Sequence, residues 1–292
     1  MINIIAAFLG LLYSTYTDIK TGYVDDWLSH TLIVLGVIFV PIFYPHRIIE
    51  AYLIAALVFA LGFVLYIFGN IGGGDVKLFT AISLLLPYYN EDIAGLFSFL
   101  GIRPVIPPYP FIFSVFLLSG IIFMLVMSSF YFYKILKYRK KIEEFHRKAL
   151  IGFAYAVVLL PFFYYWSYFS WFFTLLYIPI SITCFIIPFK ADFVKLFFAR
   201  KKSVSKLDDD DILALEIMDK DIIKKLGVKR KTHTNWELKK IKENAKKYGI
   251  KTVPVCENLP KYVPYILISF ILNLLTGDFF LYMLKLSNTV IF

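Results

Sequence analysis

Cysteine and charge are both scarce in this sequence. The 292 residues include two cysteines, Cys184 and Cys256. Two thiolates cannot supply the four ligands of a structural zinc site between them, which excludes a cysteine-based zinc module. Charged residues make up 18% of the chain, against 59% for hydrophobic residues. A water-soluble core cannot bury so much apolar surface, which indicates an integral membrane protein.

A basic segment ahead of residues 2–17 and a small-x-small cleavage site after them are also lacking. A secretory signal peptide needs both features. We therefore expect residues 2–17 to form the first membrane helix of the protein.

Long apolar runs dominate what is present. A helix needs about 20 such residues to cross about 30 Å of hydrocarbon. The assignment of two candidate segments as membrane spans stays open, because 76–88 is short and 150–188 fits either two tilted spans or a re-entrant hairpin. The sequence predicts an all-α polytopic membrane protein with six to eight transmembrane helices. The candidate runs are 2–17, 27–44, 50–69, 76–88, 111–133, 150–166, 168–188 and 262–284.

The distribution of basic residues predicts the orientation of these helices. Seven lysines and arginines fall in 134–149 and nineteen in 189–261, whereas the opposite loops hold Arg47 and Arg103. The positive-inside rule then puts both basic segments in the cytoplasm and the N-terminus outside. The net charge of +10 follows from this topology. We expect no nucleic-acid partner, because aromatic residues do not interleave with the basic runs.

Three regions are expected. Residues 1–188 form a membrane-embedded catalytic core with a cytoplasmic loop at 134–149. Residues 189–261 form a small cytoplasmic α or α+β subdomain, since acids open and lysines and Gly227 close a helical pattern there, and "IKTVPV" is typical of a strand. Residues 262–292 are expected to form the last transmembrane helix and an outer tail.

Two aspartates are expected at the cytoplasmic ends of separate helices. Asp18 closes the first apolar run in "YSTYTDIKTGYVDDWLS", and Asp75 opens the fourth in "GNIGGGDVKLF". Neighbouring carboxylates share one proton, so that one can activate a water while the other polarises a scissile carbonyl. This chemistry requires no metal and no cofactor. The glycines Gly72, Gly73 and Gly74 would let the backbone approach an extended substrate.

Structural interpretations compete with this one at each position. Asp18 alone fits a residue at a helix end, and Asp75 alone fits an N-cap. Asp25 and Asp26 fit caps of the second helix better than catalysts. Lys77 fits an interfacial anchor that biases Asp75 toward its ionised form.

The helix ends predict how the two aspartates divide the work. Asp18 follows the C-terminal end of a helix, where free carbonyls disfavour negative charge, and Asp75 opens a helix, where free amides favour it. We expect Asp75 to be the ionised base and Asp18 to carry the shared proton.

The segments "TDIKTGYVDDWLS" and "GGGDVKL" resemble the type IV prepilin peptidase and archaeal preflagellin peptidase family, membrane aspartyl proteases of the GxGD type. The resemblance covers residues 1–133 and resumes in "PKYVPYILISFILNLLTGD". It implies a catalytic pair at Asp18 and Asp75, with Gly72 and Gly74 as the fixed glycines of the loop. It also implies substrates that are pilin or preflagellin precursors, cut at the cytoplasmic face of the cell membrane between a short basic leader and the hydrophobic segment.

Other features separate this chain from parts of that family. Bacterial members carry a cysteine-rich zinc region and can methylate the new N-terminus, which two cysteines do not support. By this resemblance, the stretch 150–188 and the region 205–250 look like additions to a smaller archaeal preflagellin peptidase, so the class of precursor stays open.

Two other functions are possible on the sequence. A protease of the presenilin or signal-peptide-peptidase type would cut within a transmembrane segment, but a Pro-Ala-Leu motif in the last helix is missing. A transporter or channel would use the glycine loop as an unwound helix, and inverted hydropathy symmetry is not visible. A second glycine–aspartate pair, Gly277 and Asp278, lies about 24 Å beyond residue 262 along a helix, too far to join the other aspartates.

Overall fold

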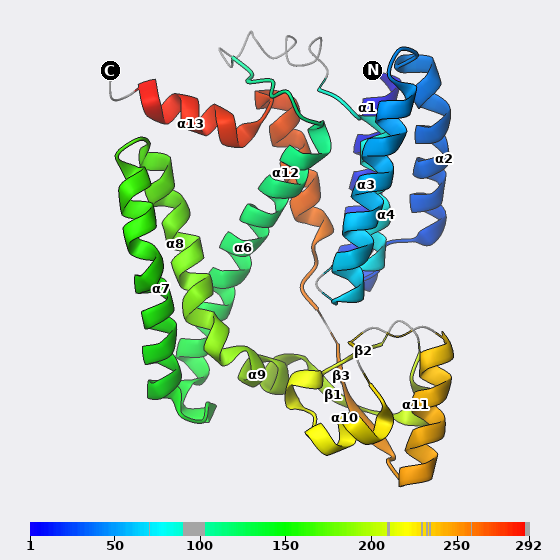
Figure 1. Ribbon diagram of the computed structural model, residues 1–292, viewed down its shortest axis with the longest axis vertical. Helices are drawn as coiled ribbons and strands as arrows, with labels where there is room; N and C mark the ends of the chain where they lie inside the picture. The colour runs from blue at the N-terminus through cyan, green and yellow to red at the C-terminus, as the bar shows by residue number, and fades with distance from the viewer. Residues whose placement is uncertain are drawn as a thin grey trace. The chain divides into compact units, whose positions relative to one another are not determined.

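The structure is a computed structural model that describes residues 1–69, 71–89, 103–208, 211–228, 230–231, 233, 235–257 and 259–289 (Figure 1). The chain divides into two compact units. The first comprises residues 1–60, 74–187 and 261–292, and the second comprises residues 61–73 and 188–260.

The protein is an all-α polytopic membrane protein with one small sheet, as the sequence predicts. Six helical segments in the described part of the chain are long and apolar enough to cross a membrane. Shorter helices accompany them in the described part of the chain, among them α4 (Gly73–Leu85), α12 (Val263–Thr276) and α13 (Phe279–Thr289). The six long segments contain α1 (Ile2–Thr21), α2 (Asp26–Phe43), α3 (Ile48–Ile67), α6 (Phe111–Tyr138), α7 (Phe145–Ser167) and α8 (Trp171–Ile186).

The connection between α1 and α2 is a tight turn. Gly22 adopts a left-handed φ of 85°, and its N–H donates to the Asp18 carbonyl at 2.9 Å, so α1 ends in a glycine cap. Asp25 occupies the N-cap position of α2, but its side chain makes no capping hydrogen bond. Its carboxylate instead accepts from the Tyr13 hydroxyl at 3.3 Å. The expected cap role of the Asp25 side chain is therefore wrong.

The apolar stretch 150–188 forms two helices joined by a short turn. The Ser170 hydroxyl accepts the Phe172 N–H at 3.2 Å and starts α8. Gly152 lets the helices approach closely, because a Cβ there would lie 2.4 Å from the Phe185 carbonyl oxygen. Exposed aromatic side chains gather at the turn, as expected where a helix pair reaches a membrane interface. They include Tyr164, Tyr165, Trp166, Tyr168 and Phe169.

The apolar run 262–284, expected as one last helix, forms two. The chain breaks at Gly277, which has a φ of 76° and approaches Val105 so closely that a Cβ would lie 2.2 Å from the Val105 oxygen. The Asp278 N–H donates to that oxygen at 2.7 Å. Helix α13 then leaves in a new direction (Figure 1). The 14 residues of α12 extend about 21 Å, less than the hydrocarbon thickness.

The Asp278 side chain stabilises the backbone at this break. Its side chain is 1% exposed and accepts from the Tyr109 hydroxyl at 2.6 Å, the Leu281 N–H at 2.7 Å and the Ser114 hydroxyl. Ser114 lies on α6, so the carboxylate ties the end of α12 to that helix. Its role in the fold is polar pairing.

We expect Asp278→Asn to lower stability. The new amide N–H₂ would face hydroxyl donors in a buried site, and a buried group left unpaired costs about 1–3 kcal/mol. The midpoint of thermal unfolding of the purified protein in detergent should fall relative to wild type. An unchanged midpoint would contradict this role of the carboxylate.

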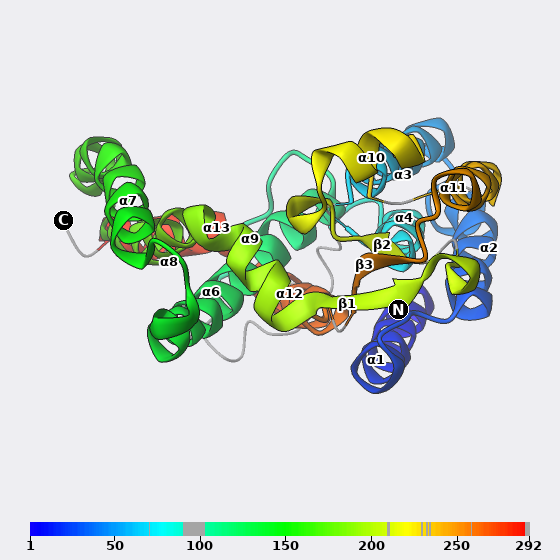
Figure 2. The ribbon, with the colours of Figure 1, turned by 90° about the horizontal axis from the view of Figure 1, so that it is seen from below.

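The second unit is an α+β unit built on a three-stranded antiparallel sheet. Strand β3 (Thr252–Cys256) lies between β1 (Ala199–Ser203) and β2 (Ile212–Leu213) (Figure 2). In register, Lys201 faces Pro254 and Leu213 faces Val255. Many buried apolar side chains of the unit form a cluster, which includes Leu207, Leu213, Leu226, Ile241, Val253 and Val255.

The first helix of this unit is shorter than the pattern of acids, lysines and Gly227 predicts. The sequence pattern that begins with the acidic run 208–211 was expected to be helical from its start. The structure has strand β2 first, and helix α10 covers Lys220–Leu226. The Asp219 side chain caps α10 by accepting the Asp221 N–H at 2.9 Å, and Gly227 ends it with a φ of 71°. Helix α11 covers Asn235–Tyr248.

Candidate active site

Asp18 is a buried carboxylate at the cytoplasmic end expected for α1. Its residue is 6% exposed, and its Oδ2 accepts the Val263 backbone N–H at 3.2 Å. Val263 is the first residue of α12, so Asp18 uses one of the amides that a helix start leaves free. Lys261 adds a positive charge nearby that interacts with Asp18.

Asp75 lies in the first turn of α4 and is partly exposed. The Tyr262 side chain interacts electrostatically with Asp75. The Tyr262 ring also contacts the Phe79 ring at 6.2 Å between centroids. Phe79 follows Asp75 by four residues and lies on the same face of α4. The segment Lys261–Val263 therefore contacts Asp18 through the Val263 amide and interacts with Asp75 through the Tyr262 side chain.

The three glycines before Asp75 lie at the start of α4. Gly73 and Gly74 form the first turn of α4, and none of the three has a positive φ. A Cβ on Gly74 would lie 2.9 Å from the Val24 Cβ, which means that the helix start packs directly on the α1–α2 turn. Gly74 therefore serves close packing inside the protein, whereas Gly72 is exposed ahead of the helix.

Lys77 makes an ion pair with Asp26. Its Nζ lies 2.5 Å from the Asp26 Oδ1, and the Asp26 side chain is 68% exposed. This contact is a second link between α4 and the start of α2. Asp26 was expected to cap α2, and it instead neutralises the lysine beside Asp75.

The surroundings of Asp18 bear on the expected division of labour. The carbonyl ends of α1 lie on one side of this residue, but its carboxylate points at the amide start of α12. An N–H donor and a nearby lysine both stabilise a negative charge on a carboxylate. Burial of Asp18 opposes the same charge, so the assignment of the shared proton to Asp18 stays a prediction, although both aspartates have a helix start beside them.

Tyr262 and Val263 were not singled out in the sequence. Their neighbour Pro264 gives one signal, because proline at the first positions of a helix marks a start with free amides before it. Nothing in the sequence around Val24 indicated that it packs against the glycine before Asp75. Asp278, by contrast, lies beyond the far end of α12 from Tyr262, apart from this site as expected.

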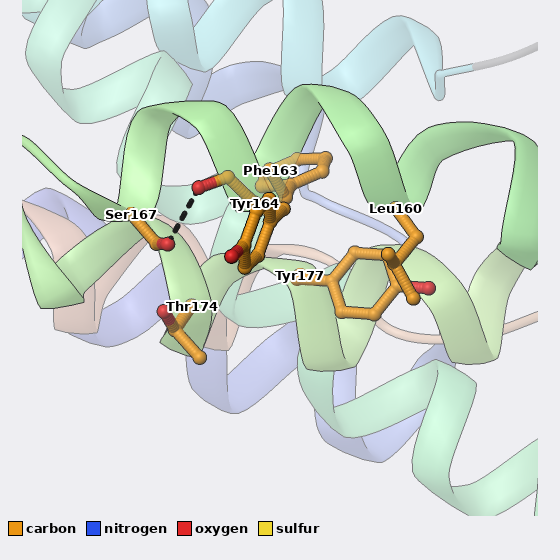
Figure 3. Close-up of a pocket in the computed structure, with 6 residues that line it drawn as sticks. All are labelled: Leu160, Phe163, Tyr164, Ser167, Thr174 and Tyr177. Atoms are coloured by element: carbon orange, nitrogen blue, oxygen red, sulfur yellow. Dashed lines mark hydrogen bonds between the residues drawn. The ribbon is translucent and has the colours of Figure 1, made fainter.

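A separate pocket lies between α7 and α8. It has a volume of about 220 Å³ and is lined by side chains of both helices (Figure 3). Its polar groups are hydroxyls, and the Ser167 hydroxyl is used locally, donating to the Tyr164 carbonyl at 2.7 Å. It has no carboxylate, which excludes aspartate chemistry there. The lining residues are Leu160, Phe163, Tyr164, Ser167, Thr174 and Tyr177.

Comparison with known proteins relates the N-terminal half of the chain to leader peptidases. Residues 5–127 match the sequence model of the type IV leader peptidase family. The chain is 34% identical over 142 residues to the prepilin peptidase EppA of Methanothermobacter thermautotrophicus, covering 46% of this chain and 36% of the relative. It is 33% identical over 100 residues to the preflagellin peptidase of Methanocaldococcus jannaschii, covering 32% of this chain and 42% of the relative.

The chain thus matches well under half the length of either curated relative. No solved structure matches it. The matched residues 5–127 include Asp18, the glycines and Asp75.

Proposed function

We propose that this protein is a membrane aspartyl endopeptidase that removes the short basic leader from type IV prepilin-like precursors, either pilins or archaeal preflagellins. One observation carries the proposal. The segment that matches leader peptidases contains two aspartates on different helices. Two adjacent residues at the start of α12 reach them, since the Val263 N–H donates to Asp18 and the Tyr262 side chain interacts electrostatically with Asp75.

Asp18 and Asp75 would act as one acid–base pair. Two nearby carboxylates hold one proton between them, so the ionised member takes a proton from water as the water attacks the scissile carbonyl. The protonated member donates a hydrogen bond to the carbonyl oxygen and then a proton to the leaving amine. No side-chain nucleophile takes part in these steps.

The proposed site faces the cytoplasm. The basic segments 134–149 and 189–261 carry seven and nineteen lysines and arginines, and the positive-inside rule assigns them to that side. With the N-terminus outside, α1 reaches the cytoplasm at Asp18. A precursor inserted in the membrane would offer its leader at this level, ahead of its hydrophobic segment.

Co-expression tests the proposal. The protein is produced with candidate pilin and preflagellin precursors, and the loss of the leader is followed by a mobility shift and by mass. We expect one precursor class to lose its leader only when the protein is present. Full-length precursors of both classes at wild-type enzyme levels would overturn the proposal.

Recognition of a basic leader should depend on carboxylates next to the site. The acidic run 208–211 is one candidate by its charge, but Asp211 is engaged in its own unit, where it accepts from Lys202 at 2.6 Å and from the Asp208 N–H at 2.8 Å. Asp209 and Asp210 lie outside the described residues. Asp208 and Asp211 precede β2, so they do not cap a helix. Exposed Asp26, beside the site, remains the better candidate.

We expect Asp26→Lys to raise KM for a basic leader at low salt. One exposed charge pair is worth up to about 1 kcal/mol, so the effect should be roughly fivefold and should fade as salt is added. Asp208→Lys, a matched reversal at an exposed aspartate in the second unit, should leave KM unchanged. Equal KM values for wild type and Asp26→Lys at low salt would contradict the idea.

A further inference from the structure

Tyr262 has neighbours in both aspartate-bearing helices and in α6. Its backbone precedes the Val263 amide that Asp18 accepts. Its ring contacts Phe79 on α4 at 6.2 Å and Phe123 on α6 at 5.1 Å. Its hydroxyl lies 2.9 Å from the Ser119 hydroxyl, also on α6.

The contacts with α6 fix the position of this tyrosine. Ser119 is fully buried, and its hydroxyl donates to the Phe116 carbonyl at 3.0 Å. The Tyr262 hydroxyl is then the donor in the pair with Ser119. About two turns further along α12, the Ser269 hydroxyl donates to the Val115 carbonyl at 2.8 Å. Helix α12 is therefore held against α6 by polar contacts at its start and along its length.

A displacement of Tyr262 would act on both aspartates at once. The Val263 amide would lose its distance to Asp18, because the two residues are adjacent in the backbone. The contact between the Tyr262 ring and Phe79, which lies on the same face of α4 as Asp75, would be lost at the same time. The two carboxylates share a proton only while their separation is kept.

We propose that Tyr262 is a positioning residue that fixes the separation of Asp18 and Asp75 from its anchorage on α6. The proposal rests on the proposed function, since it assigns a role within the same site. The tyrosine does not exchange a proton with the substrate. The contact of its ring with α4 maintains the separation of the two aspartates, and the hydrogen bond between its hydroxyl and Ser119 keeps the ring in place.

Three variants of the full-length protein test this role on one cleavable precursor. We expect Tyr262→Ala to lower kcat roughly 100-fold with little change in KM, because small misplacements of reacting groups cost about that much. The pH–rate profile should also shift by about half a unit or more, because the two carboxylates titrate as a coupled pair. Tyr262→Phe, which keeps the ring contacts, should recover kcat to within about tenfold of wild type, since it loses one hydrogen bond of roughly 1 kcal/mol.

Tyr265→Ala is the matched control. Tyr265 follows on α12 and contacts the same Phe123 ring at 5.4 Å, but it has no described contact with α4. It should lower stability without moving the pH–rate profile. Two results would overturn the proposal: a Tyr262→Ala enzyme with wild-type kcat and pH profile, or a Tyr262→Phe enzyme as inactive as Tyr262→Ala. Failure of wild type to cleave any precursor would instead overturn the proposed function.

Discussion

Asp18→Asn and Asp75→Asn should each abolish precursor cleavage while the protein still accumulates in the membrane. Each substitution removes the base or the proton donor of the pair, and general acid–base catalysis is worth roughly 10² to 10⁴ in rate. Asparagine retains the size of the side chain and can still accept the Val263 N–H that Asp18 receives. Purified variants assayed on one precursor, normalised to folded protein, provide the measurement.

Asp278→Asn is the matched control for this pair of variants. Asp278 is also a buried aspartate next to a glycine, but its hydrogen bonds all serve the break between α12 and α13. We expect it to retain most activity per folded molecule, with any loss following its lower stability. A fully active Asp18→Asn enzyme, or a folded but inactive Asp278→Asn enzyme, would refute the assignment of the site.

Gly74→Ala should inactivate the enzyme almost as strongly as loss of an aspartate. The new Cβ would lie 2.9 Å from the Val24 Cβ, so either α4 or the α1–α2 turn must move. Asp75 is the next residue, and a shift of about 1 Å in a reacting group can cost roughly 100-fold in rate. The ratio kcat/KM on a purified precursor is the quantity to compare with wild type.

Two further variants make this prediction specific. Gly73→Ala should remain active, because its Cβ would make an ordinary contact with the Tyr66 ring at 3.5 Å. Adding Val24→Gly to Gly74→Ala removes the obstructing atoms and should restore much of the activity. If Gly74→Ala stays inactive with Val24→Gly, the glycine is needed for something other than this contact.

The membrane helices and the two aspartates could be predicted from the sequence because their signals are local. Apolar length alone identifies the six long segments, although it leaves open whether the two segments within 150–188 are two spans or a re-entrant hairpin. Asp18 and Asp75 stand out because carboxylates are costly at the edge of apolar runs.

The surroundings of these aspartates could not be predicted, because they depend on contacts between distant parts of the chain. Val263 follows Asp18 by 245 residues and contributes a backbone amide, which any residue type but proline has. The role of Gly74 depends on where Val24 lies, and the glycine pattern alone favours a flexible loop. The break at Gly277 lies inside a continuous apolar run, where hydropathy predicts a single helix.

The position of the scissile bond tests the central claim most directly. Full-length protein in lipid nanodiscs is incubated with a purified pilin or preflagellin precursor, and the intact masses of both products are determined. We predict a single cut between the basic leader and the hydrophobic segment, which is absent when Asp18→Asn or Asp75→Asn protein is used. A cut inside the hydrophobic segment, or cleavage that persists in both variants, would contradict the account.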